Sequence, residues 1–562
     1  MTQFQLQGIG VAPGIAIGRA QLIRRWEVTA TGVLLADEES VRREVEQYQN
    51  AVHRSIEELE VLMDGQPAEV AEMLGVQIVI LEDPQWEDDV LARIVEDKKN
   101  AGDAVLEVMR KWMRQFREME GEYFQEKDTD MEDIGRRMLK NLGRGEVTDD
   151  LLQDFDVILV AADLNPSDLI SRDSSRVVGF ATRAGGTMSH VAIVARLRGL
   201  VAVAGCGIEL EPVADGDWLV LDGEAGVVLV NPEPAVIEQY REKRKEQGAA
   251  SRSLRSLKNK AAVTTDGTAI ELLANIGSIE DMEAALEQGA QGVGLLRTEL
   301  LFMQSNSLPT EEEQFIFYKN ILVRAGGRAV TIRTLDIGGD KALPYLPLPK
   351  EENPFLGYRA IRISLDRPDL FLTQVRAILR ASAFGRCRIL LPMISHVEEV
   401  LRAKELIAEA REELMGRQLA FDPRIAVGIM IEVPAAALIA DQLAEEVDFF
   451  SIGTNDLCQY TLAVDRMNEK IKALYDPFHP GLLRLIRYVI FEAQGHCIPV
   501  GMCGEMAGDP KATLLLLGMG LEEFSMNAAS IPVIKNIILN NSMEKARAVC
   551  EDFMGKGISG LL

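Results

Sequence analysis

The sequence predicts a multidomain α/β protein: a β/α domain with an inserted α-helical bundle, followed by a (β/α)8 TIM barrel. Three observations lead to this prediction. Strand-like, glycine-punctuated sequence near the N-terminus is interrupted by a long helical stretch and then resumes. A highly charged segment follows the second strand-like stretch. Beyond that segment, eight strand-like runs recur at fairly regular intervals, and most of them are separated by helical patterns. A (β/α)8 barrel has this number and alternation of elements.

The first β/α domain is predicted to consist of residues 1–30 and 146–231. Residues 8–23 are typical of short strands around a Pro-Gly turn, because they are rich in glycine and small apolar residues. Strand-like sequence returns at residues 156–162 and again at residues 218–222. We therefore expect the two pieces of this domain to pair with each other.

Residues 31–145 are predicted to form the helical insert. This stretch is rich in Glu, Arg, Lys, Met and Leu, and its apolar residues recur at helical spacing, for example at Val70, Met73, Leu74 and Leu81. We expect four or so helices packed as a bundle.

Residues 232–260 are predicted to be a linker helix, and residues 261–562 the barrel. After two prolines, the linker carries charges of alternating sign and little apolar surface, which indicates a solvated helix and a hinge between two halves. The eight strand-like runs of the barrel are 264–277, 292–302, 329–338, 387–395, 426–434, 447–456, 498–505 and 522–528.

Composition narrows the function classes. The formal net charge of −27 argues against a nucleic-acid or anionic-membrane surface and favours a basic protein partner. No apolar run is long enough for a membrane helix, and the first residues lack the pattern of a secretory signal. The six cysteines have no CxxC or zinc-site spacing, so we expect reduced thiols. The expected location is the cytoplasm.

His190 is the candidate nucleophile of the first domain. It follows Gly185-Gly186 and a short polar stretch and opens an amphipathic helix, so free backbone N–H groups and the positive end of the helix dipole favour an anion beside it. Because a neutral imidazole is a good nucleophile near pH 7, His190 is suited to hold a phosphoryl group. The alternative is a capped helix whose histidine is incidental.

A second set of candidates lies at the predicted C-terminal strand ends of the barrel, where barrel enzymes collect their catalytic residues. Arginines there offer bidentate forks for phosphate or carboxylate oxygens, and two acids offer the oxygen ligands that Mg²⁺ prefers. The residues are Asn275, Arg297, Arg333, Glu432, Asn455, Asp456 and Cys503. Taken singly, each charged residue has the alternative of a rim salt bridge. Cys503 is a candidate general acid, with an inert thiol as the alternative.

Together, the two sets of residues make the chain resemble Enzyme I of the bacterial phosphotransferase system over essentially its whole length. Shared strings include the Gly-Gly-x-x-Ser-His site, Leu295-Leu296-Arg297-Thr298-Glu299, Asp336-Ile337-Gly338-Gly339-Asp340-Lys341, Gly453-Thr454-Asn455-Asp456, Asp465-Arg466 and Gly501-Met502-Cys503-Gly504-Glu505. Their order and spacing carry the resemblance, because no single string would suffice.

The resemblance implies that phosphoenolpyruvate binds in the barrel, with Mg²⁺ held by Glu432 and Asp456. The ligand's phosphate and carboxylate would be gripped by Arg297, Arg333, Arg359, Asn455 and Arg466. His190 would attack the phosphorus, Cys503 would protonate the enolate to pyruvate, and the phosphohistidine domain would pass the group to the carrier HPr. The helical insert would bind HPr through acidic residues, namely Glu69, Glu72, Glu82 and Asp83. The resemblance also implies a homodimer through the barrel.

Three departures from the family pattern bear on transfer rate and carrier preference. Thr187-Met188 stands where the family usually has Arg-Thr, Asn165 replaces a threonine, and Gln77 replaces a frequent histidine. An Enzyme I paralogue feeding a regulatory carrier of the nitrogen type therefore stays an alternative. A phosphoenolpyruvate synthase or dikinase relative needs a nucleotide site, and the sequence contains no phosphate-binding loop of the Gly-x-x-x-x-Gly-Lys type. A non-catalytic scaffold is the remaining alternative.

Overall fold

The computed structural model divides into two compact units, residues 1–249 and 250–562. It describes residues 3–23, 30–63, 68–118, 122–144, 155–164, 168–169, 176–186, 190–305, 307–339, 343, 345–349, 351–468 and 470–555. Among the helices in these ranges, none is both long enough and apolar enough to cross a membrane.

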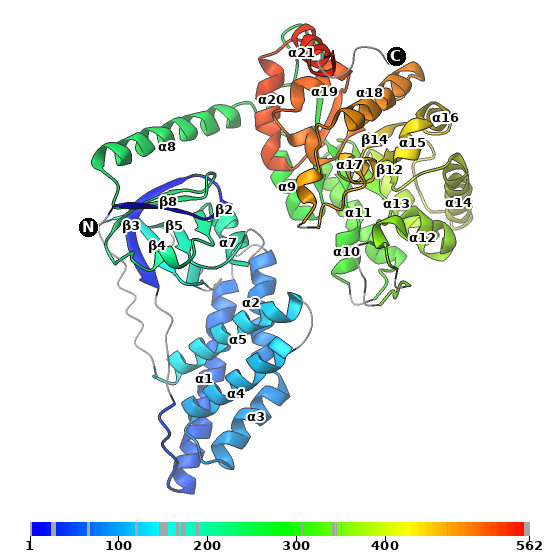
Figure 1. The fold of residues 1–562 in the computed structure, drawn as a ribbon. Coiled ribbons are helices and arrows are strands. Elements are labelled where there is room, and N and C mark those ends of the chain that lie inside the picture. The colour runs from blue at the N-terminus through cyan, green and yellow to red at the C-terminus, as the bar shows by residue number, and fades with distance from the viewer. Residues whose placement is uncertain are drawn as a thin grey trace. The chain divides into compact units, whose positions relative to one another are not determined.

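The first unit contains an eight-stranded sheet in the order β1-β8-β7-β3-β4-β5-β6-β2 (Figure 1). Strand β3 pairs antiparallel with β7 and parallel with β4, and β1 pairs antiparallel with β8. The N-terminal strands therefore pair with strands after the insert, as predicted. The strands are β1 (Phe4–Gln7), β2 (Ile9–Ala12), β3 (Ile15–Ile23), β4 (Val157–Ala161), β5 (Val177–Thr182), β6 (Val201–Ala204), β7 (Trp218–Asp222) and β8 (Val227–Val230).

The insert is helical, and its described part contains five helices, where the periodicity suggested four or so. They are α1 (Glu38–Met63), α2 (Ala68–Leu81), α3 (Pro84–Val95), α4 (Ala101–Glu118) and α5 (Glu122–Asn141). On α1 the buried residues Tyr48, Ala51, Ser55 and Leu59 recur every three or four positions, so this long helix presents one face to the bundle. The same core cluster continues into the sheet through Leu159.

Helix α8 (Pro234–Arg255) runs through the segment predicted to be a linker helix and spans the boundary between the two units. Pro234 occupies its first position, where a missing N–H costs nothing. The hinge itself stays a prediction.

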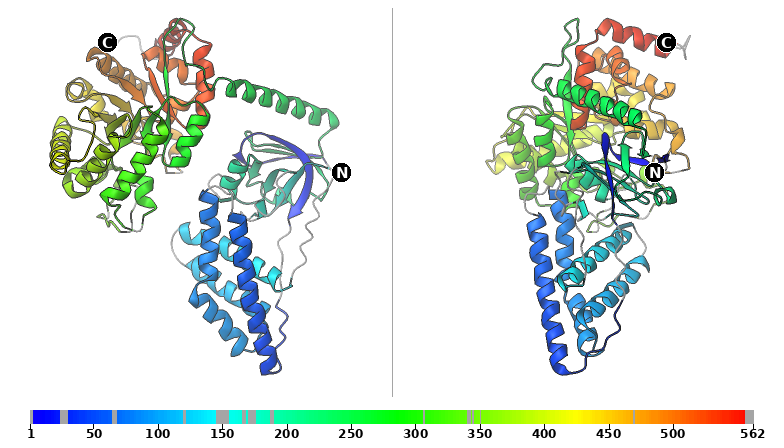
Figure 2. Two further views of the ribbon diagram at one scale, coloured as in Figure 1. Left: turned by 180° about the vertical axis from the view of Figure 1, so that it is seen from behind. Right: turned by 90° about the vertical axis from the view of Figure 1, so that its left-hand side faces the viewer.

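The second unit is a closed barrel of eight parallel strands in the order β10-β11-β12-β13-β14-β15-β16-β9, with helices around it (Figures 1 and 2). Each predicted run contains one strand. The strands are β9 (Glu271–Ile276), β10 (Val293–Leu296), β11 (Val330–Arg333), β12 (Cys387–Leu391), β13 (Ala426–Ile431), β14 (Phe450–Ile452), β15 (Val500–Met502) and β16 (Glu523–Met526). The TIM-barrel prediction is confirmed.

The barrel helices and their bounds are α9 (Ile279–Glu287), α10 (Glu299–Met303), α11 (Glu311–Ala325), α12 (Ile361–Asp366), α13 (Pro368–Ser382), α14 (Val397–Gly416), α15 (Pro434–Leu438), α16 (Ala440–Ala444), α17 (Thr454–Leu462), α18 (Pro480–Gly495), α19 (Thr513–Met519), α20 (Ile531–Leu539) and α21 (Met543–Gly555). Three of them meet at Glu311 of α11, which accepts hydrogen bonds from Arg376, Arg380 and Arg417 at 2.8–3.1 Å.

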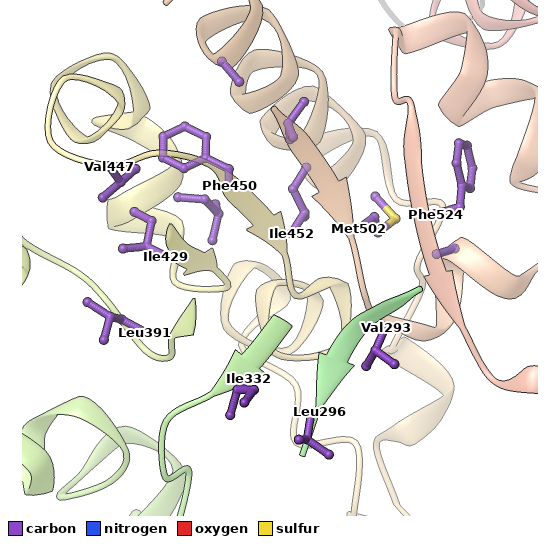
Figure 3. Close-up of a cluster of buried hydrophobic side chains, with 14 of the residues drawn as sticks. Val293, Leu296, Ile332, Leu391, Ile429, Val447, Phe450, Ile452, Met502 and Phe524 are labelled. Atoms are coloured by element: carbon purple, nitrogen blue, oxygen red, sulfur yellow. The ribbon is translucent and has the colours of Figure 1, made fainter. Parts of the chain in front are cut away.

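Side chains alternate between two layers along the barrel strands. Residues such as Leu296, Leu391 and Met502 belong to the large core between strands and helices (Figure 3). Their neighbours Leu295, Leu390 and Cys503 form a separate buried cluster with Met430 and Phe449. Because alternate residues of a barrel strand face opposite sides, this second cluster fills the barrel interior, and Cys503 lies in it.

Candidate active site

The barrel brings the polar residues at the strand ends to one rim. Arg333 is the last residue of β11, Glu432 directly follows β13, and Cys503 directly follows β15. Asp456 lies in the first turn of α17, which begins two residues after β14 ends. In a parallel barrel all C-terminal strand ends point the same way, so these side chains converge.

A buried ion-pair network joins two of the arginines through Asp336. The Nη1 atom of Arg333 lies 2.9 Å from Asp336 Oδ2, and the Nη2 atom of Arg359 lies 3.0 Å from Asp336 Oδ1. Arg333 also donates to Glu299. Burial opposes the charge of Arg333, but the charges of Glu299 and Asp336 outweigh it and raise its pKa. Both guanidinium groups are therefore charged at any physiological pH, and the Nε atom of each has no hydrogen-bond acceptor among the described residues.

Glu432 and Asp456 form a pair of buried carboxyl groups beside this network. Burial, together with repulsion from Asp456 and Asp336, raises the pKa of Glu432 to about 8. One oxygen of Glu432 accepts a 2.6 Å hydrogen bond from the backbone N–H of Met393, a residue in the left-handed region at φ 58°. The Oδ1 atom of Asp456 is buried and has no hydrogen-bond donor among the described residues. The charges of these two carboxylates therefore oppose each other when both are ionised.

Three further candidates lie around this centre. Arg466 reaches to 3.7 Å from Asp456 Oδ1, and Arg359 to 3.6 Å from Asp456 Oδ2, so both arginines face the same carboxylate. The Asn455 side chain instead exchanges hydrogen bonds with Glu505, at 3.0 and 3.2 Å. Arg297 is exposed and forms no ion pair with a described residue; it lines a cavity of about 480 Å³.

Cys503 is buried at the edge of this cavity, directly before Gly504, which lines it. Burial raises the pKa of its thiol, although a hydrogen bond with Ser451 and the charge of Arg333 oppose the rise. The thiol is therefore protonated at neutral pH, as a proton donor must be. All six cysteines of the chain are free.

Sequence reasoning missed several residues of this site. Tyr460 accepts a 3.1 Å hydrogen bond from Arg359 and donates to the carbonyl of Phe355, so it ties α17 to the loop after β11. Asp336 and Glu299 belong to motifs in the sequence, but the motifs alone do not predict that either residue pairs with an arginine of the site. Their positions near strand ends were the available signal. Asp340 and Lys341 of the same motif lie outside the described residues.

In the first unit, His190 is the first residue of α7 (His190–Arg198), as predicted. Its side chain, and residues 187–189 before it, lie outside what the structure describes, as does Asn165. Gly185 has φ 105°, a conformation that favours glycine.

The acidic candidates of the insert lie in two places. Glu69 and Glu72 belong to α2, but their side chains are outside the described set. Glu82 is exposed in the turn after α2. Asp83 is the N-cap of α3 and accepts a 2.8 Å hydrogen bond from the Gln85 backbone, so this carboxylate has a structural role. Gln77, a departure from the family pattern, is buried and donates to Asp133 at 2.9 Å.

Comparisons with known proteins agree with this organisation. Three family models match: the N-terminal domain of PEP-utilising enzymes at residues 7–127, their mobile domain at 154–226, and their PEP-binding domain at 251–543. The phosphoenolpyruvate-protein phosphotransferase of Bacillus sp. strain S is 42% identical over 98% of this chain and 96% of its own length. That of Haemophilus influenzae is also 42% identical, again over 98% and 96%. That of Bacillus subtilis is 42% identical over 98% and 97%. The chain is therefore a phosphotransferase that belongs to the phosphoenolpyruvate-protein phosphotransferase family.

Proposed function

We propose that the barrel binds phosphoenolpyruvate, that His190 takes its phosphoryl group, and that the group then passes to a histidine of an HPr-like phosphocarrier in a sugar phosphotransferase system. The observation that carries this proposal is the convergence of Arg333, Arg359 and Arg466 on the same rim as Glu432 and Asp456. Phosphoryl transfer needs charge neutralisation and alignment more than covalent participation by the protein, and this set of charges supplies both.

Arginine forks suit a ligand with two anionic ends. The guanidinium groups of Arg333 and Arg359 are already oriented by Asp336, so little side-chain entropy is lost when they bind phosphate or carboxylate oxygens. Arg297 lines the cavity and has no ion pair within 4.0 Å among the described residues. We assign Arg297, Arg333, Arg359, Arg466 and Asn455 to substrate binding.

The residues present fit a magnesium ion. Glu432 and Asp456 are buried carboxyl groups that repel each other, and Asp456 Oδ1 lacks a hydrogen-bond donor among the described residues. Gly453 leaves room beside them, because a Cβ there would lie 2.9 Å from Glu432 Oε2. Two carboxylates with substrate phosphates and waters are a usual Mg²⁺ site. Bound there, the ion would neutralise charge on the substrate's phosphoryl oxygens.

The proposed reaction has two steps, phosphoryl transfer to His190 and protonation of the enolate that remains. An imidazole nitrogen of His190 forms a bond to phosphorus while the bond from phosphorus to the enol oxygen breaks, leaving the enolate of pyruvate. The Cys503 thiol then gives its proton to the methylene carbon of the enolate, and water restores the thiol.

The proposal extends to the rest of the chain. We assign residues 1–30 and 146–231 to the phosphohistidine domain, 31–145 to the HPr-binding insert, 232–260 to the linker helix and 261–562 to the phosphoenolpyruvate-binding barrel. Glu69, Glu72, Glu82 and Asp83 would face the basic carrier. We also propose a cytoplasmic location and a homodimer formed through the barrel.

Radiolabelled phosphoenolpyruvate tests the proposal. Incubation of the full chain with the labelled compound and Mg²⁺ is expected to give acid-labile, alkali-stable label on His190 and one pyruvate per label. ATP in place of phosphoenolpyruvate should give no label, whereas a dikinase relative would be labelled by it. Properly folded protein that stays unlabelled would refute the proposal. Transfer from labelled protein to sugar-type and nitrogen-type carriers then ranks the two pathways.

A further inference from the structure

The barrel interior beside Cys503 is polar where a barrel of this kind is ordinarily packed with branched apolar side chains. Asn275 of β9 and Ser525 of β16 both alternate with residues of the outer core, so both face the interior. Ser525 is buried and donates a 2.7 Å hydrogen bond from Oγ to Asn275 Oδ1. The Asn275 amide oxygen is therefore the end that faces Ser525.

The donor end of the amide is directed at Cys503. The Nδ2 atom of Asn275 donates a 2.8 Å hydrogen bond to the carbonyl oxygen of Cys503, reaching past β16 to the end of β15. On its other side, the Cys503 N–H donates to the carbonyl of Ile452 at 3.1 Å. Both backbone polar groups of Cys503 are therefore held by hydrogen bonds, which leaves few orientations to its Cα–Cβ bond.

Two glycines make room for this arrangement. A Cβ on Gly294 of β10 would lie 2.4 Å from the Ser525 hydroxyl, so only glycine leaves that hydroxyl where it meets Asn275. A Cβ on Gly504 would lie 1.8 Å from Thr454 Oγ1, so the backbone after the thiol packs directly against the start of α17, which carries Asp456. The thiol is thus placed relative to both the barrel wall and the carboxylate helix.

From these contacts we propose that Ser525 and Asn275 form a positioning relay that fixes the Cys503 thiol against one face of the enolate. In this relay both residues act through the Cys503 backbone, because the Asn275 amide is bonded to the Cys503 carbonyl and to Ser525. The consequence is a stereochemical one, because a thiol held on one side delivers its proton to one face of the planar enolate. The inference rests on the proposed function, in which Cys503 is the proton donor.

The test uses the full chain with Mg²⁺ and the methyl-substituted substrate (Z)-phosphoenol-2-oxobutyrate in D2O. The product carries one deuterium at C3, and immediate enzymatic reduction preserves its configuration for NMR analysis. The unaltered protein is expected to give one epimer. Asn275→Asp keeps the acceptor for Ser525 but loses the donor to Cys503, so it is expected to give a mixture of epimers and a kcat lower by about tenfold, with little change in KM.

One further variant and a control keep the test decisive. Ser525→Ala frees the amide without adding charge and should also give mixed epimers, which covers a failure of Asn275→Asp to fold. Thr331→Val, which removes a part-buried 2.9 Å hydrogen bond that Arg388 donates on the same barrel, should keep one epimer.

Cys503→Ala, which has no proton to give, separates the two levels of the proposal. Mixed epimers from Cys503→Ala with a single epimer from both relay variants would overturn the relay and leave the proposed function intact. A single epimer from Cys503→Ala itself would remove Cys503 as the proton donor, and the relay with it. Mixed epimers from all three variants, with a single epimer from the control, support the relay.

Discussion

Substitution of Gly504 by alanine is expected to impair phosphoryl transfer in protein that still folds. The new Cβ would lie 1.8 Å from Thr454 Oγ1, 2.7 Å from the Thr454 backbone nitrogen and 2.9 Å from its Cβ. Rotation of the hydroxyl relieves the first contact, but the other two require the backbone to move. Because Thr454 is the first residue of α17, the displacement carries Asn455 and Asp456 with it.

The size of the effect follows from these distances. Contacts below 3.0 Å essentially never occur, so the Thr454 backbone nitrogen at 2.7 Å must move back by about 0.3 Å to reach that limit and by about 0.7 Å to reach ordinary contact at 3.4 Å, at a cost of about 1–3 kcal/mol for an overpacked site. A misplacement approaching 1 Å in a catalytic group reduces rates by about 100-fold. We therefore expect kcat/KM for phosphoenolpyruvate to fall by about 10- to 100-fold in folded protein.

The assay is the rate of pyruvate release in the presence of Mg²⁺ and a carrier, with circular dichroism to verify folding. Gly495→Ala is the matched control, because a Cβ on this glycine at the end of another barrel helix meets nothing within 4 Å. Replacing Thr454 by alanine in the Gly504→Ala background removes only the hydroxyl contact and leaves those with the backbone nitrogen and Cβ, so it should restore little of the rate. Unchanged kcat/KM in Gly504→Ala would show that the position of α17 does not control the site.

Three other substitutions give separate tests. Burial raises the pKa of Glu311 in the folded protein, but hydrogen bonds from three arginines outweigh this and lower it to about 2. Glu311→Gln removes the charge that these arginines stabilise. At about 1.4 kcal/mol per pKa unit, reduced for solvent screening, the variant should lose about 1–2 kcal/mol at pH 7. The difference should shrink as pH falls from about 4.5 to 2; a pH-independent difference would contradict this cause. All four tryptophans lie within residues 1–249. Unfolding of the barrel is therefore the transition that circular dichroism detects and tryptophan fluorescence does not. Asp336→Asn leaves two buried guanidinium groups without their shared carboxylate and should destabilise the barrel by about 3–5 kcal/mol in denaturant unfolding, whereas a loss below about 1 kcal/mol would mean that the network is dispensable. Tyr460→Phe removes a hydrogen bond to Arg359 and should raise KM for phosphoenolpyruvate about tenfold with little change in stability; an unchanged KM would exclude a role in substrate binding.

Much of the barrel and its rim could be predicted, because the repeating strand and helix patterns can be read locally in the sequence and together imply one architecture. Eight strand-like runs separated by helices imply one closed barrel, and closure places every C-terminal strand end on one rim. Arg333, Glu432 and Cys503 needed only their position at a strand end to be found. The pairing of N-terminal strands with strands after the insert followed from the same strand pattern on both sides of a helical stretch.

What escaped prediction depends on side-chain directions across elements far apart in sequence. Asp336 bridges Arg333 and Arg359, and Asn275 reaches the Cys503 carbonyl 228 residues away; no periodicity encodes either contact. Asp83, which stays a proposed carrier contact, also caps α3 as the residue before Pro84, and the sequence analysis does not assign it that role. The Asp-Pro pair was the local signal for that cap.

Isotope exchange between pyruvate and phosphoenolpyruvate tests the central claim most directly. Because a phosphorylated imidazole is the proposed intermediate, the protein with Mg²⁺, phosphoenolpyruvate and labelled pyruvate should form labelled phosphoenolpyruvate with no carrier present. His190→Gln should abolish this exchange, whereas His53→Gln, at an exposed position on α1, should leave it unchanged. Exchange that persists at the original rate in His190→Gln would contradict the account.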